Sequence, residues 1–129
     1  MKYDLQAIRR KNKKLALHLK RKAKIRKIIV GTKERPRLSV FKSAKHIYIQ
    51  AIDDSLSATI ASACSTEPAI RDRIKGLKKV EVAKLVGEVL GKKLVDSKIS
   101  TAVFDRNGFR YTGRIAAIAD GVRSASLTI

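Results

Sequence analysis

The alternation of hydrophobic and polar residues predicts three consecutive strands between residues 38 and 65. Residues 38–41 and 46–52 alternate with a period of two, as in strands that have one buried face. Residues 43–45 between them are short enough for a hairpin, and residues 59–65 predict a weaker third strand of mostly small side chains. One face of the second strand carries Ile47, Ile49 and Ala51, and the opposite face carries His46, Tyr48 and Gln50.

The second half of the chain predicts a helix, a short strand and a second helix. Residues 80–95 place large aliphatic side chains at helical spacing, and residues 115–122 do so over a shorter length. Residues 101–104 between them are a short apolar run, typical of a strand buried on both faces. Asn107-Gly108 then predicts a tight turn, whereas residues 67–80 are irregular or helical. The two helical stripes are Val82, Leu85, Val86, Val89, Leu90 and Leu94, followed by Ile115, Ile118, Ala119 and Val122.

This order of elements predicts an α/β fold. The mixed sheet has three antiparallel strands and one parallel strand, the fourth strand lies parallel to the first, and both helices pack on the sheet. Gly87 and Gly91 each weaken the first helix by about 1 kcal/mol relative to Ala, so we expect them to let that helix approach the sheet closely. With 129 residues, of which 44% are hydrophobic, the chain supports one core and no second domain.

The N-terminal segment predicts an arm that precedes the globular domain. A sparse apolar stripe recurs at helical spacing but cannot bury a core, so we expect residues 1–34 to be helical or disordered until they bind a partner. Residues 31–36 read as a linker, and Pro36 favours an extended segment after it. Residues 35–129 then form the globular domain. The stripe of the arm is Leu5, Ile8, Leu15 and Leu19, interrupted at Asn12 and Lys22.

The net charge points to a polyanionic partner. The chain has 30 Lys and Arg residues against 11 Asp and Glu, which leaves +19. Residues 1–27 hold twelve basic side chains and one acidic side chain, and the first fifty residues together carry +15. Such blocks are typical of nucleic-acid-binding arms. A membrane partner is not expected: the arm has no Trp or Phe, there is no secretory h-region, and no apolar run approaches the ~20 residues of a membrane span.

The residues that could support catalysis do not form a recognisable site. A metal-dependent nuclease would place carboxylates at strand ends, but such sites need three or four converging acids and the charge balance points the other way. Asp53 and Asp54 are better interpreted as turn formers, and Asp105 as a turn former or a partner of Arg106. We therefore expect no enzyme activity, metal, cofactor or small-molecule substrate. Cys64 stands alone, which excludes an internal disulfide and predicts a small buried side chain in a reducing compartment. The residues considered are Asp53, Asp54 and Asp105, together with the isolated His18 and His46.

Two groups of basic and aromatic residues favour nucleic-acid binding. If the fourth strand lies beside the first, both groups meet at one edge of the domain, where Arg can bridge phosphates. Tyr48 and Tyr111 can stack on bases or pack against ribose, although packing on the sheet is an equal alternative for Tyr48. The first group is Arg35, Arg37, Lys42, Lys45 and His46, and the second is Arg106, Arg110, Tyr111 and Arg114.

Four ordered motifs resemble a known family. They are Arg35-Pro-Arg-Leu-Ser-Val-Phe-Lys-Ser43, Lys45-His-Ile-Tyr48, Gln50-Ala-Ile-Asp-Asp54 and Phe104-Asp-Arg-Asn-Gly-Phe-Arg-Tyr-Thr-Gly-Arg114. Together they resemble the bacterial large-subunit ribosomal protein numbered eighteen, and the match runs from the arm to Ala119-Asp120. The resemblance implies a ribonuclease-H-like core without catalysis. It also implies a monomer in the central protuberance of the cytoplasmic ribosome, where it binds 5S rRNA, 23S rRNA and neighbouring large-subunit proteins.

The resemblance and the two basic groups together define the expected RNA contacts. We expect the arm to follow the phosphate backbone and the loops to fix position, with recognition of RNA shape and 2′-hydroxyls rather than of base sequence. The expected residues are Arg9, Arg10, Lys11, Lys13, Lys14, Lys20, Arg21, Lys22, Lys24, Arg26, Lys27, Arg35, Arg37, Lys42, Ser43, Lys45, His46, Tyr48, Arg106, Asn107, Gly108, Arg110, Tyr111, Gly113 and Arg114.

Three departures from the family pattern and two rival functions remain at this point. The turn after Asp54 and the C-terminal residues 124–129 each lack an expected glycine, and residues 65–80 match poorly. A nucleoid-type DNA-compacting protein would share the charge but would need a dimer or a groove-entering element. A ribonuclease-H-like nuclease is the enzymatic rival and would require Mg²⁺.

Overall fold

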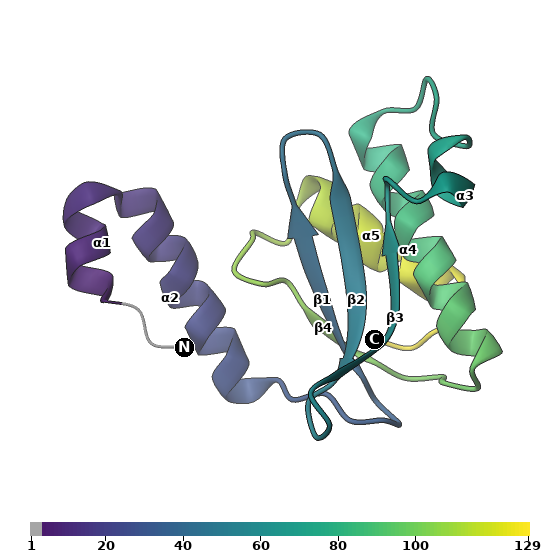
Figure 1. Ribbon diagram of the computed structural model, residues 1–129, viewed down its shortest axis with the longest axis horizontal. Coiled ribbons are helices and arrows are strands. Elements are labelled where there is room, and N and C mark those ends of the chain that lie inside the picture. Colours follow the sequence, from purple (N-terminus) through teal and green to yellow (C-terminus); the bar gives the residue numbers. More distant parts are fainter. Residues whose placement is uncertain (1–3) are drawn as a thin grey trace.

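The computed structural model describes residues 4–129, which form a helical arm and an α/β domain (Figure 1). The helices are α1 (Leu5–Lys11), α2 (Lys13–Ile28), α3 (Pro68–Arg71), α4 (Lys79–Asp96) and α5 (Gly113–Ser124), and the strands are β1 (Arg37–Lys42), β2 (Ile47–Asp53), β3 (Ala58–Cys64) and β4 (Val103–Asp105). No helix within residues 4–129 is long and apolar enough to cross a membrane. The arm is helical, which is one of the two states expected from its sequence.

The four strands form one mixed sheet in the order β3-β2-β1-β4. The pairs β1–β2 and β2–β3 are antiparallel, and β4 lies parallel to β1, as predicted. The hairpin register places Phe41 opposite Tyr48. A register shift between Ala51 and Ile52 marks an irregularity in the β2–β3 pairing. Because β1 and β4 are parallel, the segment after Lys42 and the segment after Asp105 both begin at the same end of the sheet. This end carries most of the candidate site.

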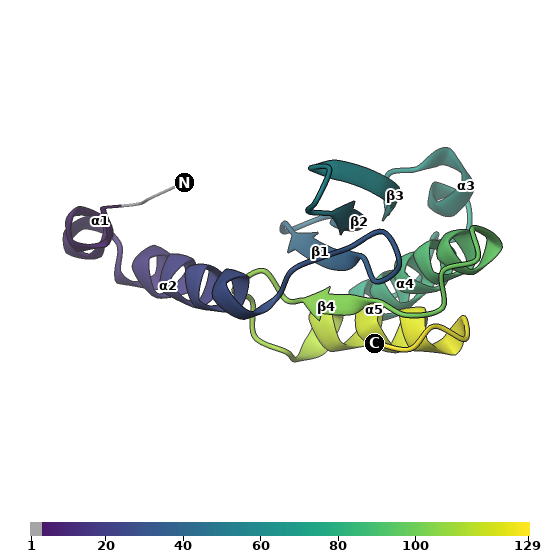
Figure 2. The same cartoon turned by 90° about the horizontal axis from the view of Figure 1, so that it is seen from below.

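The hydrophobic core lies between one face of the sheet and the helices α4 and α5 (Figure 2). The alternation in β1 and β2 buries the predicted inward side chains, and both helical stripes supply the facing side chains. The opposite face of β1 and β2 is not covered by a helix in the described part of the chain, and in Figure 1 these strands lie in front of α5. The fully or almost fully buried residues include Leu38, Val40, Ile47, Ile49 and Ala51 of the sheet, with Val86, Leu90, Leu94, Ile115, Ile118 and Val122 of the helices.

The helical glycines bring α4 against α5, so the expectation that they serve a close approach to the sheet is wrong. A Cβ atom at Gly87 would collide with the carbonyl oxygen of Ile118, and one at Gly91 would lie 2.6 Å from the Cβ of Ala125. Gly121 of α5 makes the reciprocal contact with the backbone of α4. The loss of helix propensity at these positions is therefore offset by packing between two helix backbones.

The strand β4 is an edge strand, which corrects the expectation that it is buried on both faces. Val103 and Phe104 are only half-buried, and β4 has a neighbour on one side only. Before β4, Thr101 forms an isolated parallel bridge with Thr128, outside the four-stranded sheet. The Phe104 ring packs edge-on against Tyr111, with 5.8 Å between ring centroids.

Two serines occupy backbone conformations that favour glycine. Ser57 has a φ of 49° in the β2–β3 turn, and Ser126 has a φ of 70° after α5. These are the two segments in which the resemblance implies a glycine that the sequence does not have. The fold therefore keeps the left-handed turns there, at the steric cost of a Cβ atom. The poorly matched segment 65–80 contains the short helix α3, which buries Ile70 in the core.

Candidate nucleic-acid interface

The arm folds as two helices because a polar residue caps each of them. Asp4 accepts a hydrogen bond from the amide of Ala7, and Asn12 accepts one from the amide of Leu15, both at 3.1 Å. Asn12 therefore ends α1 and begins α2, which explains the interruption in the apolar stripe. The exposed basic residues of the two helices are Arg9, Arg10, Lys11, Lys13, Lys14, Lys20, Lys24, Arg26 and Lys27.

The second half of α2 docks on the turn that follows β4. The Arg21 Nε donates to the carbonyl oxygen of Gly108 at 3.0 Å, and the His18 ring packs edge-on against Phe109 with 4.7 Å between centroids. Gly108 has a φ of 81°, and a Cβ atom there would lie 2.7 Å from the His18 carbonyl oxygen. This turn therefore needs glycine both for its backbone conformation and for the close approach of α2.

The same turn has the geometry that Asn107-Gly108 predicts. Both residues have positive φ values, 52° and 81°, and the Phe109 amide donates to the Arg106 carbonyl at 3.0 Å, which together indicate a type I′ turn. Asp105 also supports it, because its Oδ1 accepts from the Asn107 amide at 2.8 Å. Burial, followed by the charges of Arg21 and Lys22, lowers the pKa of His18, which favours the neutral form of the imidazole that packs on Phe109.

A network of hydrogen bonds and ion pairs centred on the buried Arg37 joins the arm, the sheet and the turn. Arg37 donates to both carboxylate oxygens of Asp54, at 3.0 and 3.1 Å, and to Asp105 at 2.8 Å. The carboxylate of Asp54 also accepts from the Gly31 amide at 2.7 Å and from Arg26 at 3.4 Å. The hydrogen bond from Arg37 holds the pKa of Asp54 below its ordinary value. Although burial acts to lower the pKa of Arg37, the hydrogen bonds to both carboxylates raise it.

This network corrects two expectations about single residues. Arg37 is only 8% exposed and is occupied by its two carboxylates, so it is not available to contact RNA. Asp105 pairs with Arg37 rather than with Arg106, whose guanidinium donates to the Phe109 carbonyl at 2.8 Å. The turn-former interpretation is confirmed for Asp53 and Asp105, because each accepts a hydrogen bond from the backbone amide two residues later.

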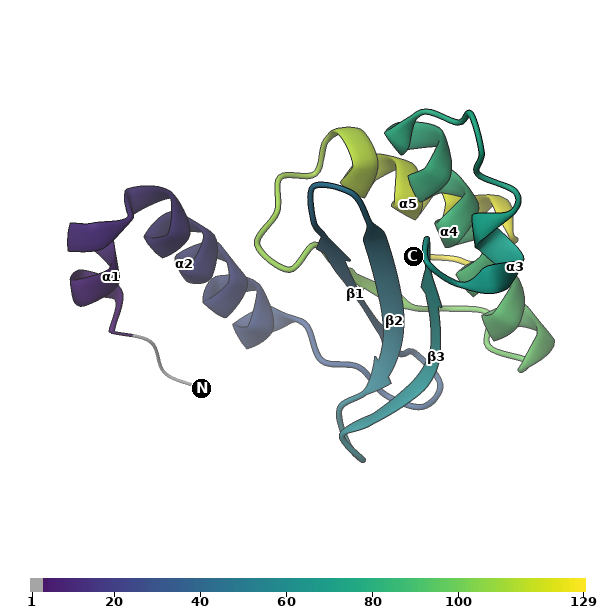
Figure 3. The ribbon, with the colours of Figure 1, turned by 45° about the horizontal axis from the view of Figure 1, so that its top comes forward.

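Lys42, Lys45 and His46 of the first basic group lie at the same end of the sheet as the second group, as the parallel β1–β4 pairing predicts. Figures 1 and 3 both show the tip of the β1–β2 hairpin beside the loop between β4 and α5. Arg114 joins them by donating to the Ser43 carbonyl at 2.9 Å. Arg35 does not join this group, because it precedes β1 and Lys42 ends that strand, which places the two residues at opposite ends. The exposed side chains of the shared end include Lys45, His46, Arg110 and Tyr111.

Sequence reasoning missed two aromatic residues of this region. The Phe109 ring contacts His18 of the arm, and its centroid lies 6.1 Å from that of Phe41. The Lys42 Nζ lies over the same ring, 5.5 Å from its centroid. Phe41 shares the open face of the sheet with Tyr48, and their ring centroids are 5.3 Å apart. The strand alternation contains the signal for Phe41, because it falls on the face opposite Leu38 and Val40. The contact between Phe109 and the arm has no local sequence signal.

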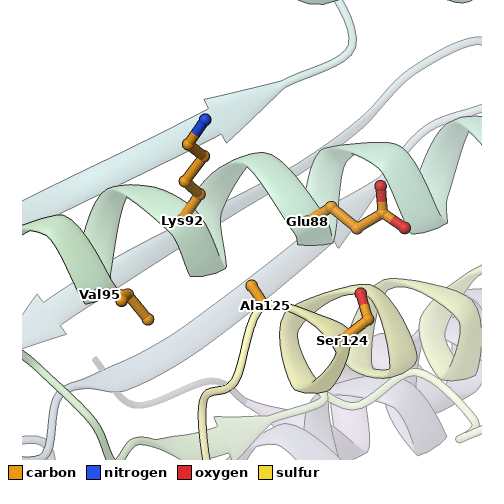
Figure 4. Close-up of a pocket in the computed structure, with 5 residues that line it drawn as sticks. All are labelled: Glu88, Lys92, Val95, Ser124 and Ala125. Carbon is orange, nitrogen blue, oxygen red and sulfur yellow. The ribbon is translucent and has the colours of Figure 1, made fainter.

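Within residues 4–129, neither the groove between α4 and α5 nor Cys64 belongs to a group of side chains that could hold a metal ion. A groove of about 430 Å³ between α4 and α5 is lined by one acid, one base and small or apolar residues (Figure 4). In this view Lys92 extends away from α5, and the Ser124 hydroxyl already donates to the Gly121 carbonyl at 2.7 Å. Cys64 is half-buried rather than buried, because β3 is an edge strand, and its sulfur lies 3.1 Å from the Thr66 hydroxyl.

Comparison with known proteins assigns the chain to a family. Residues 11–129 match the model of a family described as ribosomal L18 of archaea, bacteria, mitochondria and chloroplasts. The chain belongs to the ribosomal L18 family. It is therefore a structural protein of the large subunit of the cytoplasmic ribosome, associated with rRNA and other ribosomal proteins, and it is not an enzyme.

Individual members of the ribosomal L18 family match over most of the chain. Large ribosomal subunit protein uL18 of Desulfosudis oleivorans is 51% identical over 118 residues, which cover 90% of this chain and 95% of that protein. The protein of the same name from Dictyoglomus thermophilum is 50% identical over 107 residues, covering 83% and 88%. That from Geobacter metallireducens is 51% identical over 116 residues, covering 90% and 94%. These matches confirm the family to which the motifs pointed.

Proposed function

We propose that this ribosomal protein binds 5S rRNA and helps to attach it to 23S rRNA in the central protuberance. The observation that supports RNA binding most strongly is the arm: residues 5–28 contain eleven basic side chains and no acidic one. The helices α1 and α2 present most of these charges to solvent, beside the basic end of the sheet. The choice of 5S and 23S rRNA rests on the family resemblance of the motifs.

In the proposed mechanism the arm and the sheet end have different tasks. The arm neutralises phosphates along the RNA backbone, which supplies affinity without reading sequence. The hairpin tip and the β4–α5 loop set the position of the protein on the RNA through its shape and 2′-hydroxyl groups. Gly108 and the Arg37 network contribute by holding α2 at a defined angle to this end, rather than by contacting RNA. Arg35 lies apart from this surface and would reach only a separate segment of RNA.

A comparison of two triple variants tests the role of the arm. Lys20, Lys24 and Lys27 are exposed on α2, while Lys75, Lys84 and Lys92 are exposed on the helical side of the domain. Changing either set to Gln removes the same charge. The arm variant should weaken 5S rRNA binding and reduce the slope of log affinity against log salt by about 2 to 3, if each lysine neutralises one phosphate. The other variant should bind almost as the parent protein does.

Equal losses in the two triple variants would contradict the mechanism, because net charge alone would then determine affinity. All six lysines are exposed, so neither variant should unfold, and far-UV circular dichroism and thermal unfolding check this.

Arg114→Ala is a separate test of the sheet end. It removes the link to Ser43 and one cation, so it should weaken binding, and unchanged affinity would remove this loop from the proposed surface.

A further inference from the structure

The open face of the sheet carries an aromatic pair that the core does not use. Phe41 and Tyr48 lie directly opposite each other in β1 and β2, and their side chains are 43% and 36% exposed. Their rings are tilted by 39°, with 5.3 Å between centroids. Phe109 packs edge-on against Phe41 and holds it from the side. The two rings are therefore held in place on an exposed surface. Large aromatic side chains are more often buried in the core of a domain.

A polar depression lies over this surface, between the sheet and the arm. Its volume is about 310 Å³, and its floor includes Phe41, Tyr48 and Gln50. Lys22 of α2 forms part of one wall, and Asn107 of the type I′ turn forms another. The depression therefore combines two exposed aromatic rings, the carboxamides of Gln50 and Asn107, and the cationic side chains of Lys22 and Arg26. It has these walls because α2 docks on Gly108 and because Arg26 is tied to Asp54.

We propose that this depression holds one unpaired nucleotide of the bound RNA, with its base stacked on Tyr48 and its edge beside Phe41. Lys22 then lies where it can neutralise the phosphate of that nucleotide, and Asn107 and Gln50 can bond to the edge of the base. A base within a duplex cannot offer its face to the protein, so the site selects a looped-out or single-stranded residue. This inference rests on the proposed rRNA binding and adds a contact that the phosphate contacts of the arm do not provide.

Two substitutions of Tyr48 separate stacking from the other roles of this residue. Tyr48→Phe retains the aromatic face, whereas Tyr48→Leu retains an apolar side chain and removes the face. With a 5S rRNA transcript, Tyr48→Leu should weaken binding by about 5- to 100-fold and Tyr48→Phe should change it little. With a fully paired RNA duplex both variants should bind as the parent does. The salt dependence should stay unchanged, since neither substitution alters charge.

A fluorescent variant tests the same contact without assuming which rRNA is the partner. The chain contains no tryptophan, so Tyr48→Trp introduces a single indole on the open face of the sheet, and Leu77→Trp introduces a control indole before α4. A single-stranded adenosine decamer should quench the indole fluorescence of the Tyr48→Trp variant through stacking, and a duplex of the same length should not. The fluorescence of the Leu77→Trp variant should respond to neither RNA.

The outcomes keep this inference apart from the proposed function. If the parent protein binds 5S rRNA but Tyr48→Leu binds it equally well, the stacking site is wrong and the proposed function stands. If the parent does not prefer 5S rRNA over the fully paired RNA duplex, the proposed function fails. In that case, the stacking site is still supported if the single-stranded decamer quenches the Tyr48→Trp variant and the duplex does not. Equal quenching of this variant by single-stranded and duplex RNA would overturn the site.

Discussion

The substitution Arg37→Met tests the buried network directly. Met is an unbranched side chain that replaces the aliphatic part of Arg and lacks its charge and its donors. It removes three hydrogen bonds: two to Asp54, at 3.0 and 3.1 Å, and one to Asp105, at 2.8 Å. Asp105 is the more affected carboxylate, because its side chain is 2% exposed and it then keeps only the hydrogen bond from the Asn107 amide.

The expected loss of stability follows from the burial of the two carboxylates. Removing one partner of a buried ion pair costs about 3–5 kcal/mol, because a charge is left without compensation. Asp54 contributes the smaller share, since Arg26 and the Gly31 amide still bind it. We therefore expect Arg37→Met to lower the free energy of unfolding by about 3–5 kcal/mol.

Urea denaturation of the free protein, followed by circular dichroism, measures this change. Arg35→Met is the matched control, because Arg35 is exposed and its substitution should change the free energy by less than about 0.5 kcal/mol. The double variant that adds Asp105→Asn should recover part of the loss, since the uncompensated buried charge is then gone. A loss below about 1 kcal/mol for Arg37→Met would refute the reasoning, and Arg37 would again be a candidate for RNA contact.

Three further predictions concern packing, backbone strain and pH. Gly87→Ala should lower the free energy of unfolding by about 1–3 kcal/mol, measured in urea, because its Cβ atom would collide with the Ile118 carbonyl. Ser57→Gly and Ser126→Gly should each raise it by up to about 1 kcal/mol, visible as a higher Tm, since each relieves a positive φ. The lowered pKa of Asp54 means that its ionised form is favoured in the folded state, so its contribution is complete above the ordinary value of 3.8. That contribution should be lost as the pH falls through the lower folded-state pKa, and Asp54→Asn should flatten this part of the stability profile.

Most of the fold could be predicted because its elements are periodic in sequence. The alternation in β1 and β2 and the stripe in α5 identify the side chains that the core buries. The glycines of α4 could not be matched to their neighbour from sequence, for a physical reason. Gly87 shows that something approaches closely, but the partner, the backbone around Ile118, lies about thirty residues later and is brought there by the tertiary fold.

The candidate site was predictable as a charge distribution but not as a set of contacts. The arm is visible because its charge is local in sequence. Arg37 looks like any other basic residue of its motif, and only the fold shows it enclosed by Asp54 and Asp105. Phe41 is easily missed because an apolar residue in a strand is usually core, whereas here it faces the open side of the sheet.

The most direct test of the central claim is the affinity for 5S rRNA as a function of salt. A labelled 5S rRNA transcript is titrated with the 129-residue chain between about 50 and 200 mM salt, in the presence of excess duplex DNA. If the arm and the sheet end neutralise roughly six to ten phosphates, affinity should fall by about 10³- to 10⁵-fold over this range. Binding should also persist against the DNA at the lower salt concentrations. Salt-independent binding, or loss of binding to the DNA competitor at every salt concentration, would contradict the account.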